Sequence, residues 1–151
     1  MIGYLDTSAF VPLLVSEPSS AACRRFWDDA DAVVSSRLLY EQTAAALAQA
    51  HRMARLDDQA YSACRRLLDQ FWPQLEITEI DEALIRRAAE LADLLALRGY
   101  DALHCASAEQ LEDADLVVAS GDKRLLDAWK SLGLATFDTK TPDDTTSDPP
   151  V

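Results

Sequence analysis

The sequence is poor in glycine and proline, and it has no long apolar segment. Four glycines and six prolines in 151 residues exclude a repetitive or fibrous protein. No apolar run approaches the ~20 residues that a membrane helix needs, and no basic flank with a cleavage site follows Met1. We therefore expect a cytoplasmic protein with no membrane partner. The three cysteines are odd in number and widely spaced, which favours packing in a core over a disulfide framework.

Basic residues are also scarce, and several common catalytic motifs are missing. The 14 lysines and arginines stand against 26 aspartates and glutamates, a net charge of −12. This balance argues against a general nucleic-acid binder, since phosphate neutralisation normally needs clustered basic residues. The objection weakens if some acids hold divalent cations, which reverse the field that a phosphate meets. A glycine-rich phosphate loop, Cys/His zinc spacing and a Gly-x-Ser-x-Gly nucleophile are all missing.

The length of 151 residues and the 49% of hydrophobic residues suit a single domain. Along the chain, short apolar runs alternate with segments of helical periodicity. We predict strands at residues 1–5, 32–35, 75–80, 116–119 and 134–137. We predict helices at residues 19–29, 36–55, 57–71, 81–98, 100–112 and 122–132, with Ser36, Asp57 and Asp81 as N-caps and Gly99 as a stop. Such alternation indicates an α/β domain over residues 1–138, with a mainly parallel five-stranded sheet covered by helices on both faces. Residues 139–151, acidic and proline-containing, are expected to form a disordered tail.

Four acidic residues are candidates for a metal site. Ligands of open parallel sheets bind beyond the carboxyl ends of the strands, where Asp6 follows the first strand and Asp122 the fourth. Asp101 lies in the first turn of a helix, and Glu41 near the start of an alanine-rich helix that we expect to be largely buried. Each aspartate could simply be an N-cap, and Glu41 a surface residue. Together they form the oxygen-rich set that Mg²⁺ or Mn²⁺ prefers.

Four further residues near these acids are candidate substrate contacts: Arg98, His104, Lys123 and Arg124. Lys123 and Arg124 flank Asp122 and could meet a phosphate, although a solvated helix start is an equally good interpretation. For His104, three residues after Asp101, a packed or capping histidine is the alternative.

These residues carry a resemblance to a known family. Residues 4–9, 97–104 and 120–125, together with Glu41, resemble the PIN-domain nucleases, and more narrowly the VapC toxins of bacterial toxin-antitoxin pairs. The segment around Asp101, Arg-Gly-Tyr-Asp-Ala-Leu-His, is the most specific part. The similarity extends to about Phe137, so that only the acidic tail departs from the pattern.

The resemblance implies Mg²⁺, with Mn²⁺ as a substitute, held by the four catalytic acids Asp6, Glu41, Asp101 and Asp122. It further implies that Ser8 and Ser120 support these acids. The implied activity is endonucleolytic cleavage of structured RNA, tRNA or rRNA, which inhibits translation. The implied assembly is a homodimer that a cognate VapB-type antitoxin neutralises. We expect this antitoxin to place an arginine among the acids while an apolar segment covers helix surface near Phe10, Phe26 and Trp27.

Two alternatives of other classes stay open. A catalytically inactive PIN fold could serve as an RNA-binding or protein-interaction module, although all four acids are present. A receiver-like signalling domain needs an adjacent acid pair after the first strand, where only Asp6 stands. Metal-dependent RNA cleavage would separate the nuclease from both. If the acids converge, their repulsion should raise the pKa of at least one of them in the metal-free protein.

Overall fold

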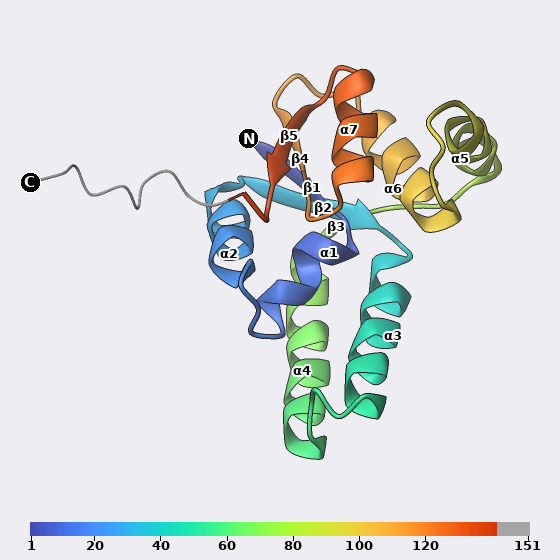
Figure 1. Ribbon diagram of the computed structural model, residues 1–151. Helices are drawn as coiled ribbons and strands as arrows, with labels where there is room; N and C mark the ends of the chain where they lie inside the picture. Colours follow the sequence, from blue (N-terminus) through green and yellow to red (C-terminus); the bar gives the residue numbers. More distant parts are fainter. Residues whose placement is uncertain (142–151) are drawn as a thin grey trace, which may run out of the picture.

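The sheet at the centre of the molecule is fully parallel (Figure 1). A computed structural model describes residues 1–141 of the chain. Its sheet has the order β3-β2-β1-β4-β5, and every neighbouring pair is parallel. The strands are β1 (Ile2–Leu5), β2 (Ala32–Ser36), β3 (Glu76–Thr78), β4 (Leu116–Ser120) and β5 (Ala135–Asp138). The predicted α/β class and five-stranded parallel sheet are confirmed.

Helices connect each strand to the next. They are α1 (Thr7–Phe10), α2 (Ser20–Asp29), α3 (Leu39–Arg52), α4 (Asp58–Phe71), α5 (Glu82–Leu94), α6 (Gly99–Glu109) and α7 (Lys123–Ser131), with short 3-10 turns at Val11–Leu13 and Trp72–Gln74. Helices α3 and α4 form a hairpin that projects from the sheet (Figure 1). The predicted N-caps Asp57 and Asp81 are confirmed, because their side chains accept backbone hydrogen bonds from Ala60 at 2.7 Å and from Leu84 at 2.9 Å.

The two faces of the sheet carry separate apolar layers. Successive side chains of a strand point to opposite faces, so Tyr4 and Val118 pack with α5, α6 and α7, whereas Leu5 and Ala119 pack with α1 to α4. All four are 0% exposed. This double burial explains why the strands read as continuous apolar runs. The three cysteines are free and buried within the same layers.

Two predicted helix boundaries are wrong. Ser36 ends β2 and does not cap a helix, since α3 begins at Leu39. Gly99 does not stop the preceding helix, because α5 already ends at Leu94 and Gly99 is the first residue of α6. The left-handed residue after α5 is Ala96, with φ 52°. The earlier turn lets Leu97, 7% exposed, enter the core. The short helix α1 was not predicted.

The aromatic residues between α1 and α2 do not form the exposed surface that we expected to meet an antitoxin. Phe10 is 0% and Phe26 is 2% exposed. The Phe10 ring packs 6.1 Å from Phe71, and the half-buried Trp27 packs 5.0 Å from the same ring, centroid to centroid. Phe26 packs 5.2 Å from Phe137 of β5. These rings pack against α4 and β5, so Phe10 and Phe26 are not the exposed aromatics that we expected; the place where an antitoxin contacts the helices stays a prediction.

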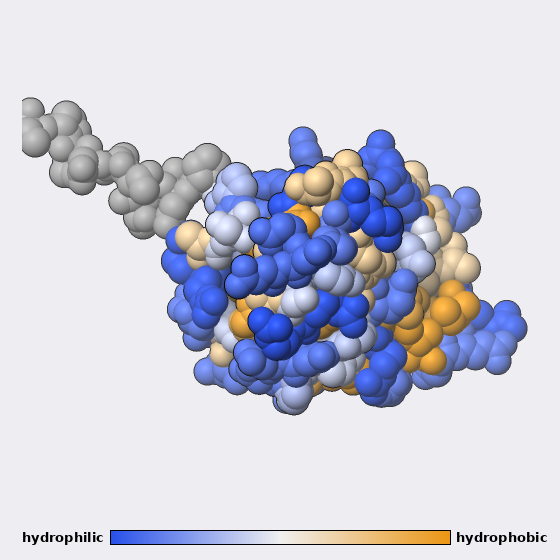
Figure 2. Space-filling model, turned by 90° about the horizontal axis from the view of Figure 1, so that it is seen from below, coloured by the Kyte–Doolittle hydropathy of each residue, from blue (hydrophilic) through white to orange (hydrophobic). Residues whose placement is uncertain are grey.

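The folded domain continues slightly beyond its predicted end at residue 138. Thr139 is 2% exposed, and its backbone N–H donates to the carbonyl of Ser120 at 3.1 Å. The rest of the predicted tail, from residue 142 on, lies outside the described residues. Within residues 1–141, no helix is long and apolar enough to cross a membrane. The end of the molecule that bears the α3–α4 hairpin is mostly hydrophilic (Figure 2).

Candidate active site

The topology places Asp6 and Asp122 on either side of the point where the strand order reverses. Strand β1 is followed in the sequence by its neighbour β2, whereas β4 is followed by β5 on the other side. Between β1 and β4 the connections therefore diverge, and such points are where α/β sheets bind ligands. Asp6 directly follows β1 and caps α1, and Asp122 follows β4 and caps α7. Each of these two aspartates therefore both caps a helix and lies at the edge of the sheet where ligands bind.

Hydrogen bonds hold the Asp6 carboxylate in one orientation. The Ser8 hydroxyl lies 2.8 Å from Oδ1 and 3.0 Å from Oδ2. Ser120 donates to Oδ2 at 2.7 Å, and the backbone N–H of Ala9 donates to Oδ1 at 3.0 Å. The Ser8 oxygen in turn accepts from the backbone N–H of Gly121 at 2.8 Å. The two serines therefore join the ends of β1 and β4 around a single carboxylate.

Burial dominates the electrostatics of Asp6. The side chain is 4% exposed, and loss of solvent raises the pKa of this carboxyl to about 6. Hydrogen bonds from Ser120, Ser8 and Ala9 oppose the shift, and the negative charge of Asp101 adds to it. We expected mutual repulsion among the acids to be the main cause of such a shift, but here it is secondary to desolvation.

Asp101 is the second acid with a perturbed pKa. It lies in the first turn of α6, half-buried, and burial raises the pKa of its carboxyl, with a further contribution from the charge of Asp122. The guanidinium groups of Arg98 and Arg124 oppose this rise. Both arginines are exposed, and they are near enough to Asp101 to act on it electrostatically.

Three of the four predicted acids line one cleft. Its volume is about 580 Å³, and it is lined by Asp6, Thr7, Glu41, Gln42, Ala45, Ala46, Gln49, Arg52, Tyr100, Asp101 and His104. Glu41 is exposed in this cleft, which agrees with the surface alternative for this residue, because it lies on the outward face of the first turn of α3. Carboxylates from the end of β1, from α3 and from α6, which are far apart in sequence, therefore line the same cleft.

Asp122 lies beside this cleft and not among its lining residues. Its Oδ1 accepts from the backbone N–H of Arg124 at 2.9 Å, and its own N–H donates to the Ser120 oxygen at 2.9 Å. Its charge nevertheless raises the pKa of Asp101. Lys123 follows it on the exposed start of α7.

His104 belongs to the wall of the cleft. It is 2% exposed, its Nδ1 lies 2.8 Å from the Tyr4 hydroxyl, and its Nε2 lies 2.8 Å from Gln42 Oε1. Burial lowers the pKa of the ring to about 4, so the imidazole is neutral at pH 7. Thr7 donates to the same Gln42 oxygen at 2.6 Å. Neither Gln42 nor Thr7 was predicted, although each adjoins a predicted acid.

The donor set suits a hydrated Mg²⁺ ion. Within residues 1–141, no group of three or more His, Cys, Asp or Glu side chains is placed so that it could hold a metal ion. Mg²⁺ usually takes one or two carboxylates and completes its shell with waters and substrate phosphate. None of Asp6, Glu41 and Asp101 forms an ion pair in the described part of the chain. A divalent cation would add positive charge to that which Arg98 and Arg124 bring near Asp101.

Comparisons with known proteins agree with this architecture. The PIN domain family matches residues 3–130. Ribonuclease VapC45 of Mycobacterium tuberculosis (strain CDC 1551 / Oshkosh) is 42% identical over 122 residues, which cover 81% of this chain and 85% of that protein.

Two solved structures share the fold at low sequence identity. Mycobacterium tuberculosis VapC20, described as a sarcin-ricin loop cleaving toxin, has a TM-score of 0.65 at 17% identity and covers 83% of this chain and 94% of its own. DNA-bound VapBC from Salmonella typhimurium has a TM-score of 0.66 at 16% identity and covers 92% and 98%. From the matched family and the ribonuclease relative, we conclude that this chain belongs to the PIN domain family, among its VapC ribonucleases.

Proposed function

We propose that this protein is a Mg²⁺-dependent endoribonuclease toxin that cuts structured cellular RNA, tRNA or rRNA, and so inhibits translation. The observation that carries the proposal is the cleft at the carboxyl edge of the sheet, which Asp6, Glu41 and Asp101 all line. Family membership among ribonucleases supports the same activity.

In this proposal Asp6 and Asp101 bind the metal directly, while Glu41 and Asp122 complete the site directly or through water. Magnesium, when bound, would polarise the scissile phosphate and acidify a nearby water; Mn²⁺ could replace it. The hydrogen bonds from Ser8 and Ser120 fix the orientation of the Asp6 oxygens before any ligand arrives. Such preorganisation lowers the cost of ordering the site during the reaction.

The family also leads us to propose a homodimer and a cognate VapB-type antitoxin. A cleft with three carboxylates suits an inhibitor that inserts an arginine, because the planar guanidinium can bind two carboxylate oxygens at once. The structure of the complex tests this directly. A complex in which no side chain of the partner occupies the cleft would contradict it.

Cleavage of RNA by the purified chain tests the central proposal. Total RNA is incubated with the protein in Mg²⁺, Mn²⁺ or EDTA, and RNA ends are sequenced after brief expression in cells. Asp101→Asn should abolish cleavage and growth arrest, because the amide keeps the shape and loses the charge that binds the metal. Asp81→Asn is the matched control, since this exposed N-cap of α5 lies outside the cleft and asparagine caps equally well.

The outcomes separate the candidate functions. Cleavage in Mg²⁺ but not in EDTA supports the nuclease. RNA that is bound and left intact would indicate the inactive binding module instead. If Asp101→Asn cleaved RNA at the parent rate in Mg²⁺, the assignment of the metal ligands would be wrong.

A further inference from the structure

The cleft extends well beyond the acids, along the exposed side of α3. Glu41, Ala45, Gln49 and Arg52 all line it. These residues recur at intervals of four, four and three, which places them in one row on a helix. With a rise of 1.5 Å per residue, Arg52 lies roughly 16 Å along α3 from Glu41. We call the part of the cleft lined by Ala45, Ala46, Gln49 and Arg52 the α3 arm.

The α3 arm has small side chains along its base and an exposed arginine at its end. Alanines at positions 45 and 46 carry no side chain that could fill the groove. The guanidinium of Arg52 is exposed, and within residues 1–141 it forms no ion pair or hydrogen bond. Three other arginines form ion pairs with neighbouring carboxylates, namely Arg37–Glu79, Arg86–Glu82 and Arg87–Glu109.

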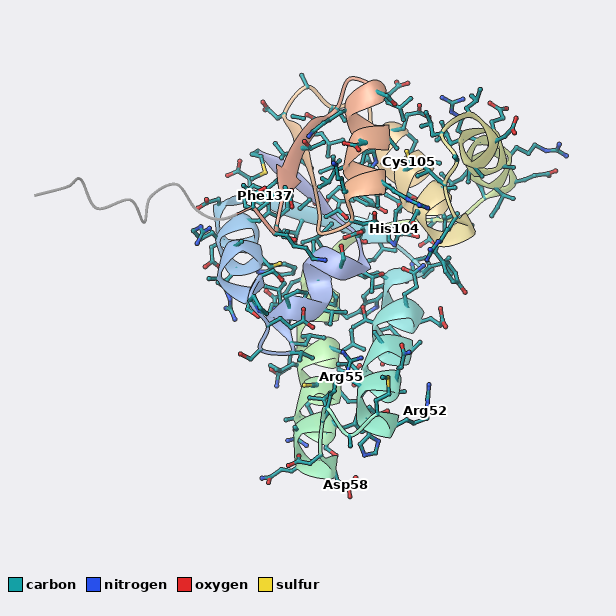
Figure 3. All side chains as sticks on the ribbon, viewed as in Figure 1. Arg52, Arg55, Asp58, His104, Cys105 and Phe137 are labelled. Carbon is teal, nitrogen blue, oxygen red and sulfur yellow. The ribbon has the colours of Figure 1, made fainter. Side chains whose placement is uncertain are left out.

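The charge distribution along the cleft indicates a role for Arg52. The other end of the cleft is anionic, and the chain as a whole carries a net charge of −12. A polyanionic substrate that crosses the acids therefore needs local cations on either side of them. Arg98 and Arg124 lie near Asp101 on one side. Arg52 is the arginine that lines the cleft at its far end, opposite His104 (Figure 3).

We propose that the α3 arm binds the RNA backbone several nucleotides away from the scissile phosphate. Arg52 forms charge-assisted hydrogen bonds to a backbone phosphate, and the Gln49 amide contacts the sugar or phosphate between it and the acids. This inference rests on the proposed ribonuclease function and extends it, because it states where the strand runs and which residues outside the acid cluster hold it.

Arg52→Gln tests the α3 arm, with Arg55→Gln as the matched control. Arg55 lies at the same end of the α3–α4 hairpin and contacts Met53 Sδ at 3.9 Å (Figure 3). It does not line the cleft of the acids; it lines a neighbouring cavity, which shares Ala46 and Gln49 with the α3 arm but not Arg52. Both variants change the net charge equally. Arg52→Lys is a second variant, which keeps a positive charge at the carboxyl end of α3 and so preserves its interaction with the helix dipole.

Two readouts are used, and one of them needs no cleavage. With a 20-nucleotide RNA containing the cut site found by RNA-end sequencing, Arg52→Gln should raise KM about tenfold and leave kcat unchanged. A tetranucleotide spanning the same bond is too short to reach Arg52, so its cleavage should not change. In the Asp101→Asn background with EDTA, Arg52→Gln should weaken binding of the 20-nucleotide RNA about tenfold and reduce the salt slope of log K by about 0.7.

The possible results are distinct. If Arg52→Gln and Arg55→Gln bind and cleave the long RNA equally, the α3 arm is wrong and the nuclease function stands. If Arg52→Gln weakens only binding of the antitoxin, the α3 arm contacts a protein and not RNA. The proposed role of the arm is then also wrong, and the nuclease function stands. If Arg52→Gln reduces kcat on the tetranucleotide, Arg52 acts on the acids and not on distant backbone. A parent protein that neither binds nor cuts RNA would refute the proposed function, and the arm with it.

Discussion

The buried carboxylate of Asp6 should make the metal-free protein less stable as the pH rises. Its pKa is raised from 3.8 to about 6 by folding. Between these values the unfolded chain has lost a proton that the folded chain still holds, so the free energy of unfolding falls with increasing pH. The full shift of about two pH units corresponds to about 3 kcal/mol, since each unit is worth about 1.4 kcal/mol. This loss is complete above the folded pKa.

Asp6→Asn replaces the titratable carboxyl by an amide. Comparison of this variant with the parent therefore isolates the contribution of Asp6 to the pH dependence of stability. The amide group places an N–H₂ donor where Oδ2 now accepts from Ser120 at 2.7 Å. Rearrangement of that hydrogen bond should cost the variant about 1 to 2 kcal/mol at every pH. The informative quantity is therefore the change with pH of the difference in unfolding free energy between variant and parent. From pH 4 to pH 7.5 this difference should move by about 2 to 3 kcal/mol in favour of the variant.

Urea denaturation in EDTA at several pH values between 4 and 8 measures this difference. Asp81→Asn is the control, because this carboxylate is an exposed N-cap. A difference between the Asp6 variant and its parent that stays constant across this range would refute the reasoning, and so would one that moves in favour of the parent. Addition of Mg²⁺ at pH 7.5 should then stabilise the parent more than Asp6→Asn, because a ligand stabilises the state that binds it.

Four further substitutions give separate tests. Ser120→Ala removes a donor from the buried carboxylate, so in EDTA it should destabilise the protein more at pH 7.5 than at pH 5, as measured by urea denaturation. Gly3→Ala would place a methyl group 2.8 Å from the Phe26 ring and should cost about 1 to 3 kcal/mol. Gly99→Ala, with no atom within 4 Å of the added group, should cost less than 1 kcal/mol, and thermal melts of both glycine variants measure the difference. Ala96→Gly should gain about 0.5 to 1 kcal/mol, because Ala96 has φ 52°, and a lower melting temperature would contradict this.

Much of the fold could be predicted from local pattern. Alternating apolar runs and helical periodicity led to the α/β class and to five parallel strands, because burial on both faces makes each strand apolar throughout. The positions of Asp6 and Asp122 at the binding edge followed from the same pattern, since the topology of a parallel sheet brings the carboxyl ends of its strands together.

Other features could not be predicted because they depend on competition between distant residues. Helix α5 ends at Leu94, despite favourable sequence up to Arg98, so that Leu97 can be buried. Phe10 and Phe26 looked available for a partner, but rings from α4 and β5 cover them. The alanine-rich helix α3 looked largely buried, but the cleft leaves the side that bears Glu41 open.

The sequence by itself determined which carboxylates stand at the ends of strands and the starts of helices, through their spacing relative to the strands. Only the tertiary structure decided how these acids differ from one another. Asp6 is enclosed by Ser8 and Ser120 and has a raised pKa, whereas Glu41 remains exposed in the same cleft. The structure also placed Arg52 in that cleft. The reason is that solvation and charge at a residue depend on all the atoms that surround it, and most of those atoms belong to residues distant in the chain.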